Sequence, residues 1–267
     1  MTKRGFTYRA AQGAGKTVLT PEKCIQQQFR LGSDVMVCLD YCTHPAAPAR
    51  EQRQSVEHTV LWAGLCKAQF ERLCGQTDRR PLLFAVIQGG NDAGLRRECA
   101  ERLLEMGFDG YGFGGWPIDK DGCLTEMVQH VAELVPARSP KWALGIGKPE
   151  HVVAAARMGY SLFDCVIPTR DARHGRLYAF AARPGRMRLA GPEFYDCLYM
   201  LDRKHIRDRV PVDATCDCLC CRTYSRAYLH HLFRIRDAAA QRLATIHNLR
   251  TYARLMELLM AGGSDGA

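Results

Sequence analysis

Three cysteines that lie close together form the most distinctive chemical pattern in this sequence. Cys216, Cys218 and Cys221 have the spacing C-x-C-x2-C, and a segment with helical periodicity further along contains His247. Three thiols and an imidazole are the ligands of a closed, tetrahedral structural zinc site, whereas packing does not readily explain three thiols this close. Cys220 competes for a ligand position, but adjacent cysteines do not easily close the same ring. We therefore predict one structural zinc ion per chain, bound by Cys216, Cys218, Cys221 and His247, with no part in catalysis.

A second candidate for chemistry is a single carboxylate, Asp164, within the stretch Phe163-Asp-Cys-Val-Ile-Pro-Thr-Arg170. The apolar neighbours predict a buried strand over 162–167, and an isolated ionised Asp is costly to bury there. Arg170 or Arg173 could supply a partner charge, so one interpretation is a structural Asp–Arg pair. The other is a reactive carboxylate at the end of a strand, and the residues alone leave both open.

Other expected strands also end in groups that can do chemistry, namely Asp40, Gln88, Gly114-Gly115 and Gly147. Apolar strands that alternate with helices indicate an α/β fold with a parallel sheet. In a (β/α)8 barrel of the TIM type all strand ends ring one pocket, where active sites lie. A doubly wound sheet is the alternative, although no G-x-G-x-x-G motif follows a first strand. The expected strands are 34–40, 82–88, 111–116, 142–147 and 162–167, and the expected helices are 21–31, 50–74, 92–106, 124–135 and 149–158.

The segment Ala10-Ala-Gln-Gly-Ala-Gly-Lys-Thr17 resembles a phosphate-binding P-loop with Ala in place of the first Gly. A P-loop must open a helix at its Lys-Thr, yet Thr20-Pro21 is itself a helix start, with Thr as the N-cap and Pro at the first helical position. We therefore interpret residues 10–17 as a glycine-rich turn and reject nucleotide binding there.

Composition and charge narrow the class of protein. The chain has 267 residues, 47% of them hydrophobic, so it can bury a sizeable core. Neither an apolar run long enough to span a membrane nor a signal peptide is present, so we expect a cytoplasmic protein whose 13 cysteines are free thiols plus a metal site. The net charge of +9 is concentrated after residue 163, which favours a polyanionic partner such as nucleic acid.

Taken in order, the motifs of this chain resemble those of the tRNA-guanine transglycosylases, which exchange a wobble guanine in tRNA for a 7-deazaguanine base. The resemblance runs from about residue 5 to the end of the sequence. The matching segments are Leu19-Thr-Pro-Glu-Lys23, Leu31-Gly-Ser-Asp34, Leu39-Asp-Tyr-Cys-Thr43, Ile87-Gln-Gly-Gly90, Gly110-Tyr-Gly-Phe-Gly-Gly115, Gly145-Ile-Gly-Lys-Pro149, Phe163–Arg170, the three cysteines, Ser225-Arg-Ala-Tyr-Leu-His-His231 and His247-Asn248.

The resemblance implies a role for each candidate residue. Asp164 would be the nucleophile that attacks C1′ of the ribose and holds the RNA covalently while guanine leaves, which suits an anion that can leave again. Asp40 and Gln88 would bind the edge of the base, and Gly115 and Trp116 would line its pocket. The base would be splayed out of its loop to reach them.

The resemblance also implies partners. Arg170 and Arg173 would bind RNA phosphates near the tRNA anticodon loop, and the incoming base would be preQ1 or queuine, with guanine leaving. A homodimer would form through the zinc-binding part and its neighbouring helices, because residues 224–260 carry more apolar side chains than one helical face needs.

Two departures from the family pattern affect these expectations. The Asp-Ser-Gly-Gly motif whose Asp is the family's general acid/base is missing, and a complete barrel takes about 250 residues. We therefore expect an N-terminally incomplete (β/α)8 barrel over residues 1–215, a zinc-binding helical subdomain over 216–267 packed on it, and little base exchange by the chain alone. The alternatives are a catalytically silent tRNA-binding subunit of a heteromeric transglycosylase and a related DNA-modifying enzyme. The second departure is Trp116-Pro117, where the family has small apolar residues.

Overall fold

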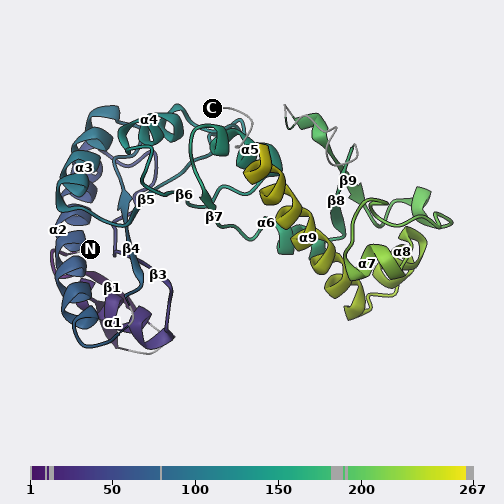
Figure 1. The fold of residues 1–267 in the computed structure, drawn as a ribbon, viewed down its shortest axis with the longest axis horizontal. Helices are drawn as coiled ribbons and strands as arrows, with labels where there is room; N and C mark the ends of the chain where they lie inside the picture. Colours follow the sequence, from purple (N-terminus) through teal and green to yellow (C-terminus); the bar gives the residue numbers. More distant parts are fainter. Residues whose placement is uncertain are drawn as a thin grey trace. The chain divides into compact units, whose positions relative to one another are not determined.

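The computed structural model describes residues 2–9, 11, 15–78, 80–181, 189 and 192–262. They form two compact units (Figure 1). Unit 1 comprises Met1–Ile146 and Arg157–Asp164, and unit 2 comprises Gly147–Ala156 and Cys165–Ala267. The functional division into 1–215 and 216–267 stays a prediction.

Unit 1 is built on a five-stranded parallel sheet. Its strands are β3 (Val35–Val37), β4 (Leu82–Ile87), β5 (Gly110–Phe113), β6 (Lys141–Ala143) and β7 (Leu162–Phe163). Each strand pairs with the next one along the chain, and the order β3-β4-β5-β6-β7 never reverses. A doubly wound sheet reverses its order at a switch point, whereas a barrel does not. The α/β fold with a parallel sheet is therefore confirmed, and the described strands form a half-barrel.

The helices of unit 1 follow the predicted pattern. They are α1 (Pro21–Leu31), α2 (Ala49–Cys74), α3 (Ala93–Met106) and α4 (Glu126–Leu134), and Figure 1 shows α1, α2 and α3 along one side of the strands. At the start of α1, the Thr20 hydroxyl oxygen accepts a hydrogen bond from the Lys23 N–H at 3.3 Å. At its end, Gly32 has a left-handed φ of 69°. Both boundaries follow from ordinary capping chemistry.

The first residues form a hairpin. Strand β1 (Phe6–Arg9) pairs antiparallel with β2 (Lys16–Leu19). Lys16 and Thr17 therefore lie in a strand and do not open a helix, which agrees with the rejection of a P-loop. Residues 10 and 12–14 of the predicted turn lie outside the described residues.

The predicted strand over 162–167 is wrong after Phe163. β7 ends at Phe163, and a short helix, α6 (Ile167–Arg173), begins four residues later. Pro168 explains the change, because proline cannot donate to a sheet but suits the first turn of a helix. Val166 is 63% exposed, so the stretch is not a buried strand.

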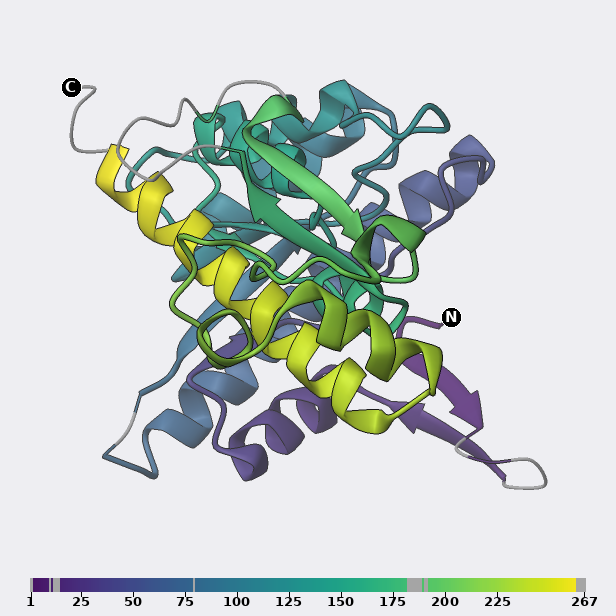
Figure 2. The ribbon, with the colours of Figure 1, turned by 90° about the vertical axis from the view of Figure 1, so that its right-hand side faces the viewer.

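Unit 2 combines a two-stranded antiparallel sheet with helices. Strand β8 (Arg176–Phe180) pairs with β9 (Tyr195–Tyr199), and α9 (Ala238–Gly262), yellow in Figure 2, packs against α6 and β8. Asn248 in α9 donates to the carbonyls of Pro168 and Arg176, both at 3.0 Å, and so ties α6 and β8 to α9. The remaining elements are α5 (Pro149–Arg157), α7 (Leu219–Thr223), α8 (Arg226–Arg234) and the 3-10 helices η1 (Pro192–Phe194) and η2 (Arg203–His205).

No helix in the described part of the chain is both long and apolar enough to cross a membrane.

The close approach of β4 and β5 gives a test of the sheet. A Cβ added at Gly110 would lie 2.3 Å from the Phe84 ring, whereas one added at Gly64 in α2 would meet nothing closer than the Met106 sulfur at 3.9 Å. Gly110→Ala should therefore lower the free energy of unfolding by about 1–3 kcal/mol or more, because Phe84 must move. Gly64→Ala should raise it by about 0.5–1 kcal/mol. Urea denaturation measures both, and equal effects would contradict the packing of this sheet.

Candidate functional site

Asp40 and Gln88, which follow β3 and β4, are joined by a hydrogen bond. Nε2 of Gln88 donates to Oδ2 of Asp40 over 2.5 Å, and Gln88 is only 1% exposed. An ionised carboxylate only accepts hydrogen bonds, so this contact fixes the orientation of the Gln88 amide. A Cβ built on Gly115, after β5, would lie 3.6 Å from Gln88 Oε1. Three of the four predicted base-binding residues therefore lie together, and they offer acceptor oxygens from Asp40 and Gln88.

Polar side chains of α2 hold the loop that follows Asp40. The Tyr41 N–H donates to the Thr59 hydroxyl oxygen at 3.0 Å, and the Thr43 hydroxyl donates to Gln52 Oε1 at 2.5 Å. Gln52 is 6% exposed, so this contact is shielded from water. The loop is thus fixed to a rigid helix, as positioning of a ligand requires.

Trp116, the fourth predicted base-binding residue, is 52% exposed. Its indole contacts the His44 ring edge-on, with the ring centroids 5.4 Å apart. The next residue, Pro117, is buried, and its carbonyl accepts from the Thr125 N–H at 2.9 Å. Trp116 therefore stands on an ordered loop with much of its ring open to solvent.

Asp164 is exposed and comes directly after β7. Its Oδ1 accepts a hydrogen bond from the Trp142 indole N–H at 2.9 Å and one from the Gly145 N–H at 3.2 Å. Gly145 has a φ of 75°, a conformation that side chains disfavour, and this turn aims its N–H at the carboxylate. Strand β6 and the loop after it therefore orient Asp164 through one oxygen.

Burial raises the pKa of Asp40 above its ordinary value, while the hydrogen bond from Gln88 opposes the increase. The ionised form is therefore held at a cost in folding free energy, since desolvation outweighs the hydrogen bonds from Gln88 and from the backbone of Asp40 itself. A buried carboxylate that is only partly compensated is typical of a binding or catalytic site.

The two predicted RNA-binding arginines both lie in α6 of unit 2 and are exposed. Nε of Arg170 lies 3.4 Å from Oδ1 of Asp171, and the other carboxylate oxygen, Oδ2, accepts from the Tyr178 hydroxyl at 2.5 Å. Arg173 has no ion-pair partner among the described residues. Arg173 is therefore the freer cation of the two.

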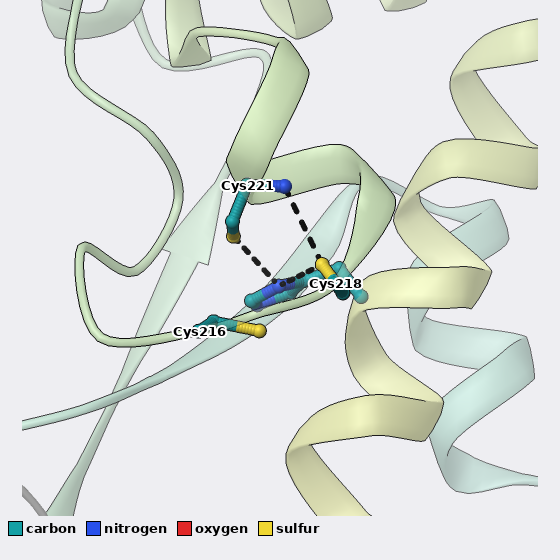
Figure 3. Close-up of side chains that lie close together, drawn as sticks. Cys216, Cys218 and Cys221 are labelled. Carbon is teal, nitrogen blue, oxygen red and sulfur yellow. Dashed lines mark hydrogen bonds between the residues drawn. The ribbon is translucent and has the colours of Figure 1, made fainter.

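The predicted metal ligands lie together in unit 2. The ligand atoms of Cys216, Cys218, Cys221 and His247 are all within 4.8 Å of one another, and all four residues are buried. Figure 3 shows the three cysteine side chains pointing toward one another. Cys220 is fully buried but lies outside this group, so it does not take a ligand place. This Cys3His cluster could bind a metal ion.

The orientation of His247 suits metal binding. Its Nδ1 lies 3.2 Å from Cys221 Sγ and 3.6 Å from Cys218 Sγ, while Nε2 lies 2.6 Å from the Tyr178 carbonyl oxygen. A carbonyl only accepts, so Nε2 carries the proton and Nδ1 presents a lone pair to the cysteines. Hydrogen bonds with Cys216 and Cys221 lower the pKa of Cys218, which favours the thiolate form that a metal needs.

Sequence reasoning missed three residues that position this site: Gln52, Arg96 and Trp142. Arg96 is 1% exposed, although arginine is rarely buried. Its spacing contains a usable signal, since Arg96, Cys99 and Leu103 recur at helical intervals on the buried face of α3. Trp142 and Gln52 give no comparable signal, because a Trp in a strand and a Gln in a helix are ordinary.

Comparison with known proteins identifies relatives over nearly the whole chain. A sequence model described as queuine tRNA-ribosyltransferase matches residues 1–260. A queuine tRNA-ribosyltransferase of Pseudoalteromonas atlantica is 38% identical over 258 residues, which are 96% of this chain and 64% of the relative. One from Shewanella halifaxensis is 38% identical over 267 residues, which are 100% of this chain and 66% of the relative. The chain thus spans about two thirds of the length of these curated relatives.

The raised pKa of Asp40 gives a test of the site. The unfolded chain loses this proton at a lower pH than the folded one, so the folded state binds more protons between the two pKa values and its stability falls as pH rises. Asp40→Asn cannot titrate. We therefore compare the free energy of unfolding of Asp40→Asn with that of the natural chain. The difference, in favour of the variant, should be smallest below about pH 3.8. It should grow as pH rises and become constant above the folded-state pKa of Asp40.

Denaturation at a series of pH values measures this difference, with the exposed carboxylate variant Asp121→Asn as the control. If Asp40→Asn and Asp121→Asn showed the same pH dependence, burial of Asp40 would have no energetic consequence.

Proposed function

The chain belongs to the queuine tRNA-ribosyltransferase family, and from that premise we propose that it exchanges the wobble guanine of tRNA for a 7-deazaguanine base. The observation that carries the proposal is the arrangement at the strand ends of unit 1. There Asp40 is hydrogen-bonded to the buried Gln88, and Asp164 is exposed and oriented. In this proposal the half-barrel belongs to a (β/α)8 barrel, whose active sites lie at these ends.

Asp164 is the proposed nucleophile. Both of its hydrogen bonds end on Oδ1, so Oδ2 would attack C1′ of the ribose. The new C1′–O bond forms as the C1′–N9 bond breaks, and guanine takes the bonding electrons. The leaving guanine takes up a proton. N9 of the incoming base then loses its proton as it attacks C1′ and displaces the carboxylate, which restores Asp164, so one proton is gained and one is released over the exchange.

Asp40 and Gln88 would recognise the base. The donors at one edge of guanine and 7-deazaguanine are N1–H and the exocyclic amino group, and the pair offers acceptors in Asp40 Oδ1 and Gln88 Oε1. Among the described residues, Gln88 is the side chain that donates to Asp40, and desolvation outweighs this compensation of its charge. A base would supply the missing donors.

We propose that the Cys3His cluster holds zinc. Three thiolates and one imidazole match the ligand preference of zinc, and the Tyr178 carbonyl fixes the imidazole from behind. Zinc in such a site supplies folding free energy and leaves no open position for a substrate.

The proposed partners are tRNA and a second copy of the chain. Arg170 and Arg173 would bind phosphates of the anticodon loop, and a tRNA substrate would place the protein in the cytoplasm.

A homodimer would need exposed apolar side chains in residues 224–260. Leu249 and Met260 of α9 and Tyr228 of α8 are exposed, whereas Leu255 in the same segment is buried in unit 2. The surplus of apolar side chains that favours a dimer is therefore smaller than the sequence indicates, and light scattering measures the outcome.

Removal of the nucleophile tests the proposed reaction. A covalent adduct between the chain and a labelled anticodon stem-loop survives a denaturing gel, and Asp164→Asn should abolish it because an amide does not attack C1′. Trp142→Phe keeps the ring but loses one donor to Asp164, and should slow adduct formation by about tenfold. Asp121→Asn is the matched control. An adduct that persists in Asp164→Asn, or none with the natural chain on tRNA, would overturn the proposal; an adduct with DNA alone would indicate a DNA-modifying enzyme.

Metal analysis tests the zinc site. The natural chain and Cys220→Ala should each contain about one zinc per chain, because Cys220 lies outside the cluster, and Cys218→Ser should lose most of it. Zinc should raise the free energy of unfolding by about 2.7 kcal/mol at a free concentration one hundred times the Kd. A folded unit 2 that contains no metal would contradict the assignment.

Salt dependence tests the RNA contacts. Each phosphate contact adds about 0.7 to 0.9 to the slope of log affinity against log salt concentration. Arg173→Gln should reduce the slope by about this amount, and Arg170→Gln should reduce it less because Arg170 already pairs with Asp171. Filter binding at several salt concentrations measures both slopes. An unchanged slope in Arg173→Gln would exclude Arg173 from the RNA interface.

A further inference from the structure

Arg96 in α3 carries a buried positive charge. It is 1% exposed, and no described residue forms an ion pair with it. Burial lowers the pKa of its guanidinium group to about 10, so the charge is retained at neutral pH at a cost. An apolar side chain would fill the same space without this cost, so packing alone does not explain an arginine here.

The guanidinium group binds three backbone carbonyls at the ends of two strands. Nη1 donates to Ile87 at 2.9 Å, Nε donates to Gly90 at 2.8 Å, and Nη2 donates to Gly114 at 3.0 Å. The first two carbonyls flank Gln88 in the chain, and the third belongs to the residue before Gly115. One planar group therefore joins the loop after β4 to the loop after β5.

The surroundings of Arg96 leave it little freedom. Its guanidinium carbon lies 4.2 Å from the centroid of the Phe113 ring, in a cation–π contact. A Cβ on Gly89 would lie 2.6 Å from the Arg96 backbone nitrogen, so the loop after β4 lies directly against α3. A side chain this confined fixes the groups it binds.

We propose that Arg96 is a positioning residue that sets the spacing between Gln88 and Gly115, and so determines how tightly the site binds a guanine-type base. The base-binding role of the site rests on the proposed function, whereas the positioning of the two loops does not. Lysine cannot replace Arg96 fully, because its single ammonium group does not reach three carbonyls in one plane. The effect should fall on binding of the base more than on attack by Asp164, which β6 orients instead.

The test compares Arg96→Lys and Arg96→Met with Arg97→Lys, a change at the exposed arginine next to it in α3. Calorimetry with guanine as the probe should show affinity reduced by about 10- to 100-fold in Arg96→Lys and more in Arg96→Met, because small displacements of positioned groups carry losses of this size. Arg97→Lys should leave it unchanged. In the residual base exchange that the chain retains, KM for the base should rise more than kcat falls, and filter binding of RNA should stay within about twofold.

Hydrogen–deuterium exchange of the same proteins supplies a readout that needs no ligand. Exchange in segments 88–90 and 114–116 should accelerate in Arg96→Lys, while exchange in β6 stays as in the natural chain. Unchanged exchange in both segments, or guanine affinity equal to that of the natural chain, would overturn the inference. If the natural chain bound no guanine but both segments exchanged faster in Arg96→Lys, the positioning role would stand and the proposed function would fail.

Discussion

Parallel pairing of consecutive strands is the constraint on which the rest of unit 1 depends. Parallel strands all run the same way, so their carboxyl ends meet at one edge of the sheet. Asp40, Gln88, Gly115 and Asp164 follow four different strands and are far apart in sequence, yet this geometry alone gives them a common edge. An antiparallel order would have sent every second one of them to the opposite edge.

That edge carries a second constraint, which is the supply of hydrogen-bond donors. The loops after β4 and β5 are rich in glycine. Glycine has no side chain that could donate a hydrogen bond to the carbonyls of these loops. Arg96 of α3 supplies donors to both of these loops, while Gln52 of α2 binds the loop after β3 and packs against the loop after β4. A Cβ on Gly90 would lie 2.6 Å from Gln52 Oε1, so glycine at this position is what lets the helix side chain approach. The site is thus shaped by helices that do not themselves contribute its reactive groups.

Much of this fold could be predicted from the sequence, because local signals and tertiary packing agree there. Thr20, Pro21 and Gly32 mark the ends of α1, and apolar runs mark β4 and β5. The cysteine cluster could also be predicted, since its ligands are encoded by residue type and spacing. The strand over 162–167 was predicted wrongly because apolar character outweighed the proline, although Pro168 is the stronger local signal.

The parts of the site that could not be predicted depend on long-range contacts. The Trp142 indole is 22 residues from Asp164, and nothing in either segment indicates that they meet. Arg96 carried a helical-spacing signal, but its three carbonyl partners come from segments whose separation is known only once β4 and β5 are paired. Sequence patterns therefore identify reactive groups more readily than the groups that aim them.

The position of α9 in the chain has a consequence for synthesis on the ribosome. Strands of unit 1 pair with the strand made just before them, so the sheet can grow as the chain emerges at about 5–20 residues per second. In unit 2, Asn248 of α9 binds a carbonyl 80 residues earlier, and the core around Leu177 and Leu229 is closed by this helix. The three cysteines of the cluster are therefore synthesised before His247, their fourth ligand. Until His247 has been added, their thiols can be oxidised or can bind a competing metal.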